Sequence, residues 1–205
     1  VLNGKAGTDT MVGFKGNDVY IIDDISDSIM ELPSEGNDLV KVSISTDRGK
    51  YTLGDNLEQA LLVNSQSYDL IGNDLDNVLT GNNASNTLDG KSGSDTLKGS
   101  AGDDVYVVDS SADRIVELDG QGADVVRIAN EFYGSIFNMD DWVEDAILPD
   151  NLANYGVTGN GSNNNILGNR GDNFLGGGAG EDTLSGGAGN DTLVGGVGKD
   201  YIDLG

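Results

Sequence analysis

Glycine recurs at intervals of nine residues in three separate blocks of this 205-residue chain. In each repeat the sixth residue is Asp or Asn and the eighth is a large apolar residue. The repeats begin at Gly4, Gly13, Gly72, Gly81, Gly90, Gly99, Gly159, Gly168, Gly177, Gly186 and Gly195. Chance matches do not hold such a phase over five consecutive units, as in the last block. The spacing therefore predicts a repeat architecture in which each unit packs on its neighbours.

The most regular repeats carry a recognisable motif. Stretches such as GGAGEDTLS and GGAGNDTLV match G-G-x-G-x-D-x-U-x, where U is a large apolar residue, and this nonapeptide is typical of calcium-binding parallel β-helices. On these residues the chain resembles the repeats-in-toxin (RTX) family of secreted bacterial proteins. The resemblance implies an all-β fold, a parallel β-roll or β-helix solenoid. We expect each x-U-x to be a short strand with U pointing inward, and two nonapeptides to complete one coil.

A longer repeat overlies the short one. Residues 18–62 align without a gap on residues 104–148, at an offset of 86. The landmarks of DVYIIDDISDSIMELPSEGNDLV recur in DVYVVDSSADRIVELDGQGADVV. We therefore expect three roll blocks, separated by two homologous, less regular β units. The blocks are residues 1–30, 72–116 and 159–205, and the intervening units are residues 31–71 and 117–158.

Short β-like runs in both intervening units favour further coils of the same solenoid. Two small inserted β domains are the alternative. The segments DNLEQALL and DDWVEDAIL could each form a turn or two of helix, but strand is favoured there.

The composition indicates that such a chain needs a ligand in order to fold. It has 32 glycines and a net charge of −24 from 35 acidic and 11 basic residues, so both chain entropy and charge repulsion oppose a compact state. Multivalent cations would counter this. Histidine and cysteine are absent, which excludes the usual zinc sites, thiol nucleophiles and the commonest general base, and leaves oxygen ligands. We expect several calcium ions as the cofactor and a largely disordered chain without them.

The repeat loops offer the ligands that calcium prefers. Calcium takes about six to eight oxygens from carboxylates, carbonyls and waters, and the loop glycines can reach φ > 0 so that carbonyls converge. The RTX resemblance implies an ion between loops that are eighteen residues apart. The implied pairs are Asp182 with Asp200, Asn173 with Asp191, Asn164 with Asp182, Asn77 with Asp95, and Asn86 with Asp104. The glycines of the last three loops, Gly177, Gly180, Gly186, Gly189, Gly195 and Gly198, are expected to contribute.

Some loops depart from the motif. Leu75, Ala84 and Ser162 replace the fourth-position glycine in loops that also carry Asn in place of Asp. We expect weaker sites there, in transition coils that lead from an intervening unit into a roll. Asn is also common in left-handed turns and in stacked ladders of metal-free solenoids, so an ion-free role stays equally open.

The nine-residue phase continues beyond the glycines. Asp27 and Asp113 lie eighteen residues after Asp9 and Asp95, which predicts two further sites at the block exits. With Asp18, this completes the predicted metal-binding set. For the acidic residues Asp23, Asp109, Glu31 and Glu117 we expect solvated surface positions, which are usual for carboxylates.

A binding and structural module, not an enzyme, is the predicted function. Arg48, Arg114, Arg127 and Arg170 are scattered and form no catalytic pattern with the acids. The acidic charge disfavours nucleic acid, and no apolar run of about 18 residues predicts membrane insertion. Alternatives are an adhesin-type module that recognises a glycan or ice, or part of a secreted polysaccharide-active enzyme.

The resemblance also implies a location. RTX proteins generally leave Gram-negative bacteria by a one-step (type I) secretion pathway with an uncleaved C-terminal signal. We therefore expect a secreted or cell-surface segment of a larger protein. Its partners would be calcium and, through the parent protein, a secretion apparatus or a cell-surface molecule.

Overall fold

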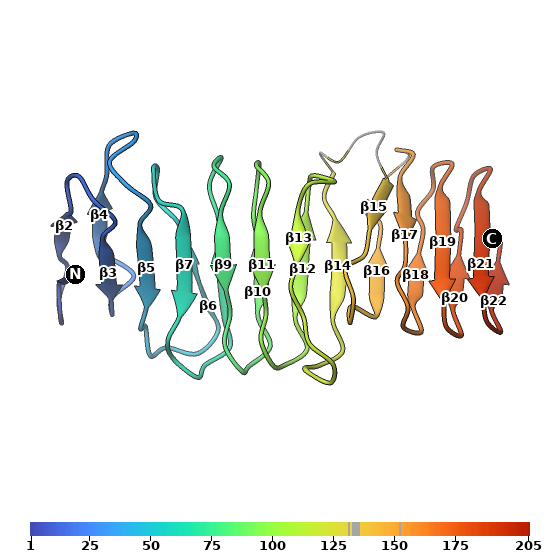
Figure 1. The fold of residues 1–205 in the computed structure, drawn as a ribbon, viewed down its shortest axis with the longest axis horizontal. Coiled ribbons are helices and arrows are strands. Elements are labelled where there is room, and N and C mark those ends of the chain that lie inside the picture. The colour runs from blue at the N-terminus through green and yellow to red at the C-terminus, as the bar shows by residue number, and fades with distance from the viewer. Residues whose placement is uncertain (131, 133–135, 152) are drawn as a thin grey trace.

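The structure is a computed structural model that describes residues 1–130, 132, 136–151 and 153–205. These residues form 22 strands and no helix, so none of them belongs to a helix that could cross a membrane. Strands follow one another as rungs along the long axis, with turns along both long edges and the two termini at opposite ends (Figure 1). The predicted all-β parallel solenoid is confirmed.

Two long parallel sheets form most of the two faces. The seven-stranded sheet runs in the order β1 (Leu2–Asn3), β3 (Val19–Ile22), β5 (Leu39–Val42), β7 (Gln59–Leu62), β9 (Val78–Thr80), β11 (Thr96–Lys98) and β13 (Arg114–Ile115). The nine-stranded sheet runs in the order β6 (Gly49–Thr52), β8 (Tyr68–Ile71), β10 (Thr87–Asp89), β12 (Val105–Val108), β14 (Val125–Ile128), β16 (Asp145–Ile147), β18 (Asn165–Leu167), β20 (Thr183–Ser185) and β22 (Tyr201–Asp203).

Two shorter sheets complete the solenoid. One pairs β2 (Thr10–Val12) with β4 (Ser28–Met30), and the other runs in the order β15 (Ile136–Asn138), β17 (Gly156–Thr158), β19 (Phe174–Ala179) and β21 (Thr192–Val197). Both segments that could have been helical instead contain strands, β7 and β16.

The intervening units are further coils of the same solenoid. In the seven-stranded sheet, β5 and β7 lie between β3 of the first roll and β9 of the second. Only the coil length changes. Leu79 pairs with Leu97, eighteen residues later, whereas Val40 pairs with Ala60, twenty residues later. The extra residues lie between the strands, because the parallel pairing itself continues.

The core is a ladder of inward-facing apolar side chains. Strand residues alternate between the interior and the surface, so every second side chain faces inward. Along the seven-stranded sheet, paired inward residues are Tyr20, Val40, Ala60, Leu79, Leu97 and Ile115, all almost fully buried. The eighth-position residues of nine of the eleven repeats lie in this core, as their phase predicts, whereas in the last two repeats Leu193 is partly buried and Ile202 is exposed.

Corresponding strands in the two copies of the 86-residue repeat lie on opposite faces of the solenoid. Residues of β3 recur in β12, nine strands later, and an odd number of strands places the copies in opposite sheets. Homologous loops of the two intervening units therefore lie on opposite edges of the solenoid. Each copy also ends a sheet at the equivalent point, since β4 and β13 are both terminal strands.

Candidate metal centre

The sixth-position side chains form ladders along the two edges. In each predicted pair, one carboxylate oxygen of the later residue accepts a hydrogen bond from the backbone N–H of the earlier one. The N···O distances are 3.1 Å for Asp182 to Asp200, 2.8 Å for Asn173 to Asp191, 2.8 Å for Asn164 to Asp182, 2.7 Å for Asn77 to Asp95 and 2.7 Å for Asn86 to Asp104. The structure therefore brings all five predicted pairs together, and their role as metal ligands stays a prediction.

The ladder extends to the two block exits. Asp27 accepts the N–H of Asp9 and Asp113 accepts that of Asp95, each at 3.0 Å. Asp113 is buried, and its second oxygen accepts the N–H groups of Asp109 and Ser110 at 3.2 and 3.1 Å. The carboxylate thus points into the stack and not to solvent. Whether it also binds an ion stays a prediction.

Seven loops carry Asp at the sixth position, and we call them the Asp loops. They begin at Gly4, Gly13, Gly90, Gly99, Gly177, Gly186 and Gly195. In every one of them the second and fourth residues have φ between 63° and 152°. This left-handed backbone explains the glycine at the fourth position, because L side chains are strained there.

The Asp loops bury carboxylate oxygens that have no hydrogen-bond partner among the described residues. These are the Oδ2 atoms of Asp9, Asp95, Asp104, Asp182 and Asp191. A Cβ added to Gly177 would overlap both Asp182 Oδ2 and the carbonyl oxygen of Gly195, which belongs to the loop stacked next to it on the same edge. The glycine therefore leaves a small space that oxygens of two consecutive loops face. Hard oxygen ligands around such a space fit calcium.

Burial makes these carboxylates costly to ionise. It raises the pKa of both Asp95 and Asp104 to about 7, because desolvation disfavours the charged form, and the nearby carboxylates Asp113 and Asp124 add to the effect. A cation between the loops would offset both causes.

Four loops carry Asn at the sixth position, and we call them the Asn loops. They begin at Gly72, Gly81, Gly159 and Gly168. Here the sixth-position Oδ1 accepts the N–H of the loop's own second residue, at 2.7 Å for Asn77 and 2.9 Å for Asn164. The second and fourth residues of these loops are not left-handed. The oxygen that lacks a partner in the Asp loops is therefore already hydrogen-bonded in the Asn loops.

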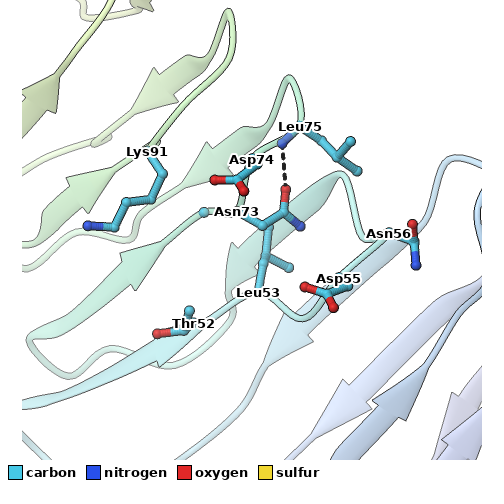
Figure 2. Close-up of a pocket in the computed structure, with 9 residues that line it drawn as sticks. Thr52, Leu53, Asp55, Asn56, Asn73, Asp74, Leu75 and Lys91 are labelled. Carbon is cyan, nitrogen blue, oxygen red and sulfur yellow. Dashed lines mark hydrogen bonds between the residues drawn. The ribbon is translucent and has the colours of Figure 1, made fainter. Parts of the chain in front are cut away.

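A second asparagine, at the second loop position, binds each Asn loop to the preceding coil. Asn73 Nδ2 donates to the carbonyls of Gly54 and Leu57 at 2.7 and 2.8 Å, while its Oδ1 accepts the N–H of Leu75 at 2.9 Å (Figure 2). Asn82, Asn160 and Asn169 each donate to two preceding carbonyls in the same way. Our sequence analysis missed these residues. The signal was available, because Asn occupies both the second and the sixth position in all four loops.

The nonapeptide repeats match a known protein family. The family model described as "RTX calcium-binding nonapeptide repeat (4 copies)" matches residues 1–21, 71–106, 80–115, 158–193 and 176–205, together more than half of the chain. The chain belongs to this family. It is a calcium-binding RTX repeat module with a β-roll fold. A search of curated proteins found none that matches it.

The RTX matches leave out most of both intervening units, which hold two further acidic groups. Glu31 and Glu117 are buried, so our expectation that they are solvated is wrong, whereas Asp23 is exposed as expected. Each Glu packs beside a repeat Asp and a third carboxylate. The two groups are Asp18, Glu31 and Asp38, and Asp104, Glu117 and Asp124, and within each group one oxygen per residue lies within 4.8 Å of the others.

Proposed function

We propose that this module folds on binding several calcium ions after export and then forms a rigid segment of a larger extracellular protein. The observation that carries the proposal is the set of buried carboxylate oxygens without a hydrogen-bond partner. Eight such atoms occur among the described residues, all at the edges where loops stack.

The cost of these atoms indicates why folding would need the ion. A buried polar group without a partner costs about 1–3 kcal/mol, and more when it is charged. Eight such oxygens are therefore comparable with the whole stability of a typical domain, about 5–15 kcal/mol. Calcium would supply the missing positive charge and coordination, so the free energy of binding would become free energy of folding.

The same coupling favours a location outside the cell. Calcium sites of extracellular modules typically have a Kd of about 10⁻⁴ to 10⁻³ M, so the chain would stay unfolded where calcium is scarce and fold where it is plentiful. An unfolded chain also suits passage through a secretion apparatus, which we propose as a partner during export. In this proposal the segment has a structural role and catalyses no reaction.

Circular dichroism with a calcium titration tests the coupling. In excess chelator the chain should give a coil-like spectrum, and it should gain strand signal cooperatively as calcium rises through the micromolar to millimolar range. Magnesium at the same concentration is the control, since it prefers a rigid octahedral site. A spectrum in chelator that already matches the calcium-loaded form would overturn the proposal.

A further inference from the structure

Each roll that leads into an intervening unit ends in the same four side chains. In the second copy they are Asp104, Tyr106, Glu117 and Asp124, and the first copy repeats them at the same spacings. The structure brings the three carboxylates of each copy together, with one oxygen of each residue within 4.8 Å of the others. In the second copy Asp104 is 0%, Glu117 6% and Asp124 1% exposed.

Hydrogen bonds use only some of these oxygens. Asp104 Oδ1 accepts the N–H of Asn86 at 2.7 Å, Asp124 Oδ1 accepts the N–H of Asp104 at 2.9 Å, and Glu117 Oε1 accepts the hydroxyl of Tyr106. Asp104 Oδ2 and Glu117 Oε2 are buried without a partner among the described residues. In the first copy the same is true of Glu31 Oε2 and Asp38 Oδ2.

No basic side chain neutralises either cluster in the described part of the chain. The ion pairs found there join Lys91 to Asp89, Arg114 to Asp140 and Arg170 to Asp150. Three carboxylates that face one another without a counter-charge repel strongly at low dielectric. The arrangement calls for a cation, and oxygen-only ligands indicate a hard divalent ion such as calcium.

The clusters differ from the stacked loop pairs of the nonapeptides. In the loop pairs the two side chains come from sixth positions eighteen residues apart, and of the five pairs only Asp182 and Asp200 supply two carboxylates. Here the second Asp follows at twenty residues, and the Glu comes from the strand-to-loop segment between them. Neither Glu117 nor Asp124 lies in a residue range that matches the repeat family, and the same holds for Glu31 and Asp38.

We propose that Asp104, Glu117 and Asp124 bind a calcium ion, and that Asp18, Glu31 and Asp38 bind a second. This inference rests on the proposed calcium-binding function and adds a second type of site, in which a Glu of the intervening unit completes the last Asp loop of a roll. Because the copies lie in opposite sheets, the two sites are on opposite edges. Each one joins an 18-residue coil to a 20-residue coil.

The variant Glu117→Gln tests the second site in the full chain, with Asp119→Asn as the matched control. Both changes remove one negative charge from the same segment, but Asp119 is exposed. Equilibrium dialysis at millimolar calcium should give one bound ion fewer for Glu117→Gln than for the parent, two fewer for the double variant Glu31→Gln/Glu117→Gln, and no change for Asp119→Asn. An unchanged ion count in the double variant would overturn the inference.

A second measurement leaves all carboxylates in place. Terbium(III) occupies calcium sites and emits when an adjacent tyrosine transfers energy to it. The hydroxyls of Tyr20 and Tyr106 touch the clusters, so replacing both with Phe should remove most of the terbium emission excited through tyrosine, and unchanged emission would contradict the site. If the parent chain binds no calcium at all, the proposed function fails. If the parent binds calcium but neither variant set responds, only this inference fails.

Discussion

The Asp loops and the Asn loops share one glycine phase and stack in one solenoid, yet they satisfy their polar groups differently. In an Asn loop, Asn77 Oδ1 accepts a backbone N–H of its own loop, and the second-position Asn73 donates to two carbonyls of the preceding coil. In an Asp loop, Asp182 Oδ2 is buried with no partner among the described residues. The same turn is thus closed by amide hydrogen bonds in one case and leaves a buried carboxylate oxygen without a partner in the other.

The Asn loops and the Asp loops occupy different positions along the solenoid. The Asn loops are the first two loops of the second and third blocks, one on each edge, where an intervening unit leads into a roll. This placement predicts that a roll begins on a coil that needs no ion of its own, and that the Asp loops become ordered on that coil. The predictions below test this contrast, from the largest expected effect to the smallest.

The largest difference should appear between Asp182→Ala and Asn77→Ala. The Asp182 carboxylate accepts the N–H of Asn164 through Oδ1, and its Oδ2 has no partner among the described residues. Its loss should remove at least one calcium ion and lower the free energy of unfolding by about 3 kcal/mol or more, since a charged hydrogen bond alone contributes about 1.5–3 kcal/mol. Calorimetric titration counts the ions of both variants. If Asn77→Ala loses as many ions as Asp182→Ala, the distinction between the loops is wrong.

The chelated chain should become more stable as the pH falls. Burial raises the pKa of Asp95 and Asp104 to about 7 in the folded state, against about 3.9 when unfolded. These groups therefore destabilise the folded state above about pH 7, and this penalty is relieved as the pH falls through 7 towards 4. Circular dichroism in chelator should therefore show more strand signal at about pH 5.5 than at pH 8.

A matched variant separates this effect from the general loss of negative charge at low pH. Asp95→Asn/Asp104→Asn removes these two buried groups and leaves the other carboxylates in place, including buried Asp113, Glu117 and Asp124, whose pKa values are also raised by burial. Its strand signal in chelator should change less with pH than that of the parent. An equal pH dependence in the two proteins would show that these loops are not the cause.

Backbone conformation distinguishes the loop types at the fourth position. Gly102 of an Asp loop has φ +122°, and a Cβ there would lie 2.7 Å from the carbonyl carbon of Ala84 in the Asn loop stacked beneath it. Gly102→Ala should destabilise the calcium-loaded chain by about 1–3 kcal/mol. The reverse change, Ala84→Gly, should cost at most about 1 kcal/mol. Chemical denaturation measures both, and equal costs would mean that the fourth position is not what separates the loops.

The nine-residue phase predicted the strands, the inward residues and the eighteen-residue stacking, because a parallel solenoid places equal positions of consecutive coils in contact. It did not predict the burial of Glu31 or Glu117. Those residues lie in coils where pairing shifts by twenty residues, and without the glycine phase the sequence does not say which acid the longer turn directs inward. The second-position asparagines do form a pattern in the sequence, but the groups that they bind do not. Their role depends on carbonyls of the preceding, irregular coil, which no repeat describes.

The smallest effect should come from Asn73→Ala, which tests whether the Asn loops are closed by amides alone. The variant loses hydrogen bonds to the carbonyls of Gly54 and Leu57, so the free energy of unfolding should fall by about 1–2 kcal/mol. The number of bound calcium ions should stay the same, because no carboxylate is removed. Asn83→Ala is the control: Asn83 is exposed in the neighbouring Asn loop, and its loss should change stability by no more than about 0.5 kcal/mol. Equilibrium dialysis beside urea denaturation gives both quantities. Loss of an ion in Asn73→Ala would mean that an Asn loop also holds calcium, and the two loop types would then differ in affinity and not in kind.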